Sequence, residues 1–140
     1  MEPNPYQPPR SPDPPSEQAE SKRKLFRLAG IGAGLAGGYW ALIGAGMALG
    51  SASGSISAGS LFAPVLAIAF YGSRAYRIFK GDAGSAVRDL VWLHAIGLIA
   101  AAIRMFSGST LLIALQGVKI AIHIFGGVTA YLAKRSEQQS

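Results

Sequence analysis

The sequence contains no cysteine among its 140 residues. The chain therefore forms no disulfide, offers no thiolate to a metal, and has neither a cysteine nucleophile nor a lipoprotein anchor. Acidic residues are absent between Glu20 and Asp82 and again between Asp89 and Glu137. These two long stretches lack the carboxylates that a zinc or di-iron site would need, and the chain contains no hydrolase or transferase motif. No metal site and no enzymatic activity are expected.

Charged residues of both signs are scarce, at 14% of the chain, whereas a soluble domain usually has about 25%. They occur in blocks between long apolar runs, which is typical of a membrane protein. The formal net charge is +6, but the basic residues flank apolar runs and do not form one stripe. The lipid bilayer is therefore the expected partner, and nucleic acid is not.

The first apolar run, residues 28–50, has no charge and no proline over 23 residues. As a helix it would be roughly 35 Å long, enough to cross a hydrocarbon core of about 30 Å. Small residues four positions apart share a face and let another membrane helix approach to backbone contact. This spacing predicts a helix-packing face formed by Gly30, Gly34, Gly38, Gly46 and Gly50.

Three further apolar runs follow, separated by Gly- and Ser-rich turns. The chain is predicted to be an all-α membrane protein, a four-helix transmembrane bundle over 25–135 with a polar tail at 136–140. Seven of the eight prolines lie in the first 20 residues, so a disordered tail is predicted for 1–24. The predicted helices cover residues 26–50, 58–80, 86–106 and 110–134.

The opening Asn-Pro-Tyr-Gln-Pro-Pro, residues 4–9, resembles the leaders of uncharacterised small multi-pass membrane proteins of bacteria. The resemblance covers six residues and implies no activity.

Basic residues fall mainly on one side of the predicted bundle. Eleven of thirteen lie in the N-terminal segment, between the second and third helices, or in the C-terminal tail. The positive-inside rule then predicts an inner-membrane protein that crosses several times with both termini in the cytoplasm. At the same boundary Asp89 is expected to pair with Arg74, Arg77 or Arg88. An interfacial aromatic belt is expected there as well, whereas Tyr39 and Trp40 are expected to be buried between helices. The belt comprises Tyr71, Tyr76, Trp92 and Tyr131.

Polar side chains inside the predicted third and fourth helices are candidates for function, because such groups are costly in a membrane. If these helices are antiparallel about Gly108, His94 and His123 lie at nearly equal depth. Lys119 then lies opposite Gly97, and we predict that its amine faces the bundle interior; a lipid-facing lysine is the alternative. The candidate polar face comprises His94, Arg104, Gln116, Lys119 and His123.

Three interpretations of the two histidines remain open. They form a structural hydrogen-bonded pair, they relay protons or ions because imidazole titrates near neutral pH, or they ligate a haem. Direct helix contact at about 8–10 Å leaves little room for a haem between them. The favoured function is a non-enzymatic membrane protein that acts by helix packing with itself or with a larger membrane complex. The alternatives are a small channel or transporter using the His and Lys face, and a haem-binding redox subunit.

Overall fold

The computed structural model describes residues 16–55, 57–105 and 110–138. Within these ranges the chain is all-α, with no strand, which confirms the predicted fold class. The described residues form four helices, and a single turn of 3-10 helix, η1, precedes the second. Their bounds are α1 Glu17–Ala52, η1 Ala58–Leu61, α2 Phe62–Phe79, α3 Gly84–Met105 and α4 Thr110–Gln138.

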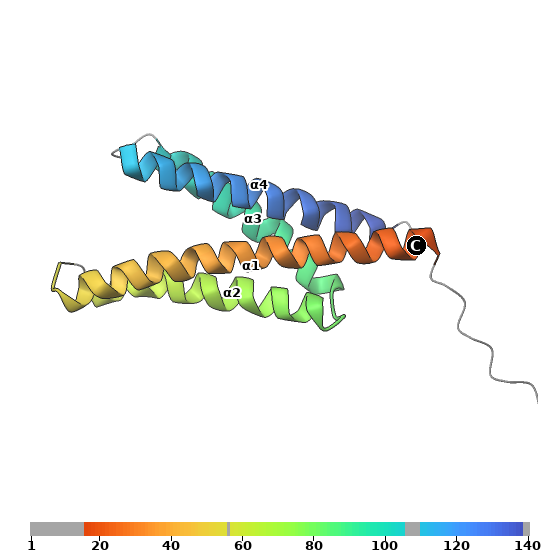
Figure 1. Ribbon diagram of the computed structural model, residues 1–140, viewed down its shortest axis with the longest axis horizontal. Coiled ribbons are helices and arrows are strands. Elements are labelled where there is room, and N and C mark those ends of the chain that lie inside the picture. The colour runs from red at the N-terminus through yellow and green to blue at the C-terminus, as the bar shows by residue number, and fades with distance from the viewer. Residues whose placement is uncertain (1–15, 56, 106–109, 139–140) are drawn as a thin grey trace, which may run out of the picture.

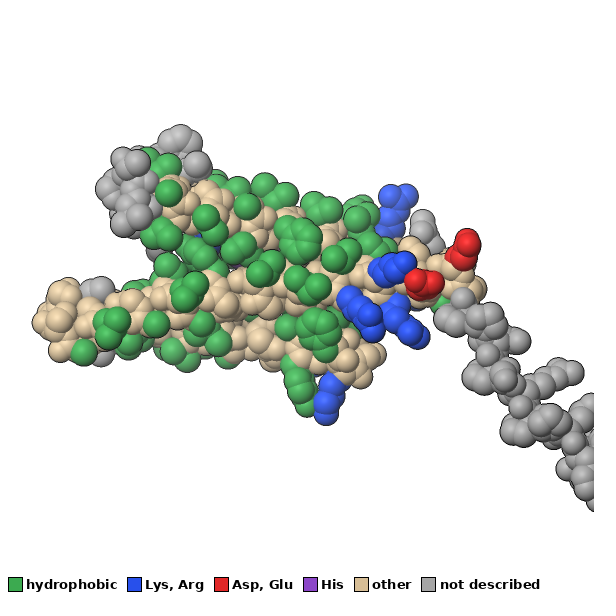
Figure 2. Space-filling view, viewed as in Figure 1, with side chains coloured by type: hydrophobic (Ala, Val, Ile, Leu, Met, Phe, Trp, Pro, Cys, Tyr) green, Lys and Arg blue, Asp and Glu red, His purple; other side chains and the backbone are tan. Residues whose placement is uncertain are grey.

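The helices form two antiparallel hairpins, α1 with α2 and α3 with α4, and the hairpins meet mainly where α1 packs on α4 (Figure 1). One end of the bundle contains the start of α1, the α2–α3 turn and the end of α4. This end, which we call the basic end, carries the visible Lys and Arg side chains in Figure 2. From there the hairpins diverge toward the opposite end (Figure 1).

Helix α1 begins earlier than predicted, at Glu17, so residues 17–24 are helical and not part of a disordered tail. The side chain of Ser16 caps the helix by accepting a hydrogen bond from the backbone N–H of Ala19 at 3.3 Å. Glu20 and Lys24 form a one-turn ion pair at 2.9 Å. These local interactions stabilise a polar helical turn that hydropathy alone does not reveal. The predicted NPYQPP leader lies outside the described residues.

Gly81 lies in the turn between α2 and α3. Gly81 has φ +90°, a left-handed conformation that ends α2, as glycine commonly does at a helix C-terminus. Helix α3 then begins at Gly84 and α4 continues to Gln138, so both extend slightly beyond their predicted bounds. Predicted helix 58–80 is divided, because its first residues form η1.

Three helices are long and apolar enough to cross a membrane. They are α1, the Gly84–Ile103 part of α3 and the Ile113–Gln138 part of α4. Helix α2, with 18 residues, is not among them. At ~1.5 Å per residue it measures roughly 27 Å, close to the thickness of a hydrocarbon core.

The predicted packing face of α1 is wrong in register. Gly34, Gly38 and Gly46 lie on the outside, and a Cβ added to any of them would meet nothing within 4 Å. Gly50 is half-buried in the last turn of α1, and its carbonyl accepts hydrogen bonds from the Ser53 and Ser55 hydroxyls just beyond the helix.

The face of α1 that packs against the other helices is adjacent to the predicted one. Of the five predicted glycines, it includes Gly30. Its other small residues are buried against α2 and α4, and a Cβ on Gly32 would lie 2.6 Å from the Cα of Gly126. At that separation the backbones of α1 and α4 touch, so glycine is required at the crossing. The buried positions of α1 are Ala29, Gly30, Gly32, Ala33, Ala36 and Gly37.

Ion pairs hold the basic end of the second and third helices. Arg74 Nη2 lies 3.2 Å from Asp89 Oδ2, and both side chains are partly buried, as predicted. Arg77 instead pairs with Asp82 at 2.6 Å and donates a hydrogen bond to Ser85 at 2.9 Å. Each arginine of α2 therefore has its own acidic partner, and these pairs fix the turn into α3.

Candidate functional site

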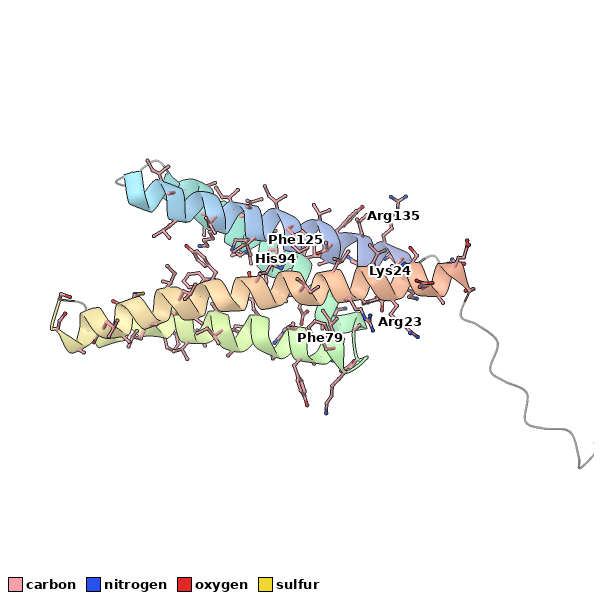
Figure 3. The ribbon with its side chains drawn as sticks, viewed as in Figure 1. Arg23, Lys24, Phe79, His94, Phe125 and Arg135 are labelled. Atoms are coloured by element: carbon pink, nitrogen blue, oxygen red, sulfur yellow. The ribbon has the colours of Figure 1, made fainter. Side chains whose placement is uncertain are left out.

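The two histidines of the chain meet in the middle of the bundle. The Nδ1 atoms of His94 on α3 and His123 on α4 are 3.0 Å apart, and the side chains are only 1% and 3% exposed. Figure 3 shows His94 near mid-length of α3. The prediction that the two imidazoles lie at equal depth is confirmed. It held because four residues separate the antiparallel helices α3 and α4, so positions at similar distances from that connection along the chain lie at the same level.

Each imidazole is accommodated by a glycine of the facing helix. The ring of His123 lies against Gly97 of α3, and the ring of His94 lies against Gly126 of α4, each so close that a Cβ would overlap the ring. Each glycine is also three residues after the histidine of its own helix. The sequence thus contains the same His-x-x-Gly spacing twice, at 94–97 and 123–126. This repeated spacing is a signal that the sequence analysis missed.

Tyr71 of α2 completes the cluster, which corrects its predicted place in an interfacial belt. Its side chain is 4% exposed, and its hydroxyl donates a hydrogen bond to the carbonyl oxygen of Leu93 at 3.0 Å. Its ring centroid lies 5.2 Å from that of His94 and 6.1 Å from that of His123. Tyr71 therefore packs α2 onto the histidine pair. Tyr76, Trp92 and Tyr131 are exposed, as belt residues would be.

Lys119 faces the bundle interior, as predicted, and is 4% exposed. Its Nζ lies 4.8 Å from the centroid of the Trp40 ring of α1, a distance at which a cation is attracted by the indole face. The aromatic contact was not predicted. Trp40 is half-buried against the core, and Tyr39, also half-buried, contacts it edge-on. Both aromatic residues are thus less enclosed than expected.

A cavity of about 220 Å³ lies between the two hairpins beside these side chains. All four helices contribute to it, and its lining includes the polar side chains of Tyr71, Lys119 and His123 together with Gly97. A second cavity of about 270 Å³ lies between α3 and α4 and includes both histidines. His123 lines both cavities, so the pair forms part of the wall between them. The apolar lining of the first cavity includes Trp40, Ala67, Phe70, Leu93 and Ile96.

Toward the basic end, the histidine pair is closed off by apolar packing. Leu90 lies one turn before His94 on α3, and Val87 lies about one turn before Leu90. Both side chains are fully buried. The partly buried Arg74–Asp89 pair lies at the same level on this side. The pair is therefore reached from the cavity between the hairpins and from the second cavity between α3 and α4, whereas buried Leu90 and Val87 separate it from the basic end within the bundle.

The remaining candidates of the predicted polar face contribute less. Gln116 is half-buried, and among the described residues its Oε1 has no hydrogen-bond partner. The side chain of Arg104 lies outside the described residues.

The geometry of the pair argues against an iron held between the histidines. Two nitrogens binding opposite sides of a metal, at about 2.0–2.1 Å each as for zinc, would be about 4 Å apart, more than the 3.0 Å observed. The described residues contain no group of three His, Cys, Asp or Glu side chains that could hold a metal ion.

Comparison of the chain with protein-family models, curated proteins and solved structures gives no match. Any functional argument therefore depends on the residues and geometry described above.

Proposed function

We propose that this chain is a small, non-enzymatic, multi-pass protein of a bacterial inner membrane whose buried histidine pair takes up and passes on protons. The observation that carries the proposal is the direct Nδ1–Nδ1 hydrogen bond between His94 and His123 at mid-length of their helices. Ionisable groups buried inside membrane helices are costly, and they commonly mark proton or ion pathways.

The hydrogen bond leaves the two Nε2 atoms as the outer ends of a short relay. In the neutral pair, one Nδ1 carries a proton and donates it to the other Nδ1. When the Nε2 of the donor imidazole accepts a proton, the bridging proton can move across, and the partner then releases the proton on its own Nε2. The Nε2 of His123 lies beside Gly97, which lines the cavity between the hairpins. This cavity supplies the route to one end of the relay.

Lys119 and the closed basic end favour a gated carrier over an open pore. The cavity reaches the pair from the side of Lys119, whereas buried Leu90 and Val87 separate the pair from the basic end. A proton that enters from one side therefore needs a movement of α3 or α2 before it can leave on the other. Lys119, one turn from His123, lines the same cavity and so lies on the entry side of the relay.

The proposed orientation places the basic end in the cytoplasm, in accordance with the positive-inside rule. Single cysteines can be introduced freely because the native chain has none. With an impermeant maleimide on intact cells, Ser55→Cys is expected to be labelled and Ala83→Cys is not. Labelling of Ala83→Cys alone would reverse the orientation.

Proton flux into liposomes containing the purified chain tests the function. An internal pH dye, with a potassium diffusion potential as driving force, should report uptake that empty liposomes lack. His123→Asn places an amide near the position of Nδ1, so it keeps a hydrogen bond to His94 but cannot titrate, and flux should be lost. Trp92→Phe, at a 67% exposed position, is the matched control. Equal flux through His123→Asn and the control would refute the proposal.

A second candidate function, helix packing with another copy or a partner, is favoured by the outward-facing glycines of α1. Gly34 and Gly38 are exposed four residues apart, a spacing that lets membrane helices associate, and no helix of the described chain occupies them. If this face mediates association, Gly34→Leu with Gly38→Leu should convert a dimer into a monomer in detergent, as measured by light scattering. A wild-type monomer would refute this candidate.

A further inference from the structure

A separate cavity of about 560 Å³ lies at the basic end, far from the histidine pair. It lies between the start of α1, the α2–α3 turn and the end of α4, and its volume is within the roughly 300–1,000 Å³ typical of ligand pockets. Three basic residues from the first turns of α1 line one wall, namely Lys22, Arg23 and Arg27.

The floor of this cavity is apolar and continues onto the membrane-facing surface. Phe26 and Ile78 are buried or half-buried there, and Phe79 is 61% exposed. The ring of Phe79 packs against Gly30, where an added Cβ would lie 3.0 Å from Cζ. A bound molecule could therefore place a charged group among the arginines and an apolar chain along Phe79. Figure 3 shows Arg23 and Phe79 on neighbouring helices at this end.

The charge balance of the cavity favours an anion. Glu137 is the one acidic residue among the lining residues, and it lies beside Gly84, on the α3 side. The lining also contains three basic residues of α1, of which Arg23 and Arg27 are exposed, so basic residues outnumber acidic ones. Basic pockets between membrane helices at the headgroup level bind anionic lipid headgroups.

We propose that this cavity binds the phosphodiester headgroup of an anionic membrane phospholipid, with an acyl chain against Phe79. Arg23 and Arg27 hold the phosphate oxygens, and the guanidinium group suits this role because it presents several donors in a fixed plane. The exposed apolar ring of Phe79 favours a lipid over a soluble phosphate, which would gain nothing from it. This site is independent of the histidine relay, so either proposal can fail without the other.

Binding of short-chain lipids to the full-length protein in detergent tests the proposal. Dioctanoyl phosphatidylglycerol is expected to bind in native mass spectrometry and to raise the unfolding temperature, whereas dioctanoyl phosphatidylcholine is not. Arg23→Gln with Arg27→Gln should weaken phosphatidylglycerol binding about 10- to 30-fold, because each basic residue at a lipid surface contributes to affinity. Inorganic phosphate serves as the soluble probe.

The matched control is Lys80→Gln with Arg135→Gln, which removes two cations of the basic end that do not line this cavity. Its phosphatidylglycerol binding should stay within about threefold of wild type, and both double variants should keep their helical circular dichroism. If both double variants weakened phosphatidylglycerol binding equally, the lipid would be held by the overall positive charge of the basic end and not by a specific site. A thermal shift with phosphate as large as that with phosphatidylglycerol would overturn the lipid assignment, as would absence of binding to wild type.

Discussion

Replacing Gly126 with alanine is a sharp test of the histidine site, because the position touches the ring of His94. A Cβ there would overlap Cε1 and Nε2 of an imidazole that is 1% exposed and hydrogen-bonded to His123. Either α3 and α4 must separate or the ring must leave its hydrogen bond. Overpacking of this kind costs about 1–3 kcal/mol, and a lost hydrogen bond about 0.5–1.5 kcal/mol.

Gly117→Ala is the matched control on the same helix. A Cβ at Gly117 would meet nothing within 4 Å, so this variant should show only the helix-propensity gain of alanine over glycine, about 0.5–1 kcal/mol. Because both variants receive that gain, the difference between their free energies of unfolding isolates the steric cost. We expect Gly126→Ala to be less stable than Gly117→Ala by about 1–3 kcal/mol.

Unfolding by denaturing detergent, followed by circular dichroism, measures this difference, and a double-mutant cycle identifies its cause. In a His94→Ala background the ring is gone, so Gly126→Ala should cost little or nothing. The reasoning is refuted if Gly126→Ala is as stable as the control. It is refuted equally if its cost is unchanged when His94 is absent.

Three further outcomes are expected from the structure. Lys119→Met should raise the free energy of unfolding, because an insertion cost of about 2.5–3.5 kcal/mol exceeds a cation–π contact of about 0.5–2 kcal/mol; a destabilised variant would contradict this. Asp89→Asn should cost about 1–3 kcal/mol because it leaves partly buried Arg74 without its carboxylate, whereas Asp82→Asn, in an exposed pair, should cost less than about 1 kcal/mol. Equal losses would show that burial does not distinguish the two pairs. Gly32→Ala should cost about 1–3 kcal/mol in thermal unfolding, since its Cβ would lie 2.6 Å from a backbone atom of α4; unchanged stability would rule out that contact.

The sequence by itself determined the four helices and the meeting of the two histidines. Long uncharged runs between Gly- and Ser-rich turns leave helices as the structure that satisfies every backbone hydrogen bond in lipid. Only four residues separate α3 from α4, and this short separation in the sequence places His94 and His123 at the same depth once the helices are antiparallel. The sequence also placed Asp89 at the same boundary as three arginines, and the structure selects Arg74 among them.

Only the tertiary structure decided which face of each helix points inward. In a soluble helix the interior face is marked by hydrophobicity, but in a membrane the lipid is as apolar as the core, and α1 is apolar and small on most sides. Gly34 and Gly32 were therefore indistinguishable by composition, yet Gly34 lies outside and Gly32 contacts α4. The location of Tyr71 could not be read from the sequence either, because an amphipathic tyrosine ring suits both a membrane interface and a buried site. The hydrogen bond from its hydroxyl to the Leu93 carbonyl, which favours burial, forms only when α2 packs on α3.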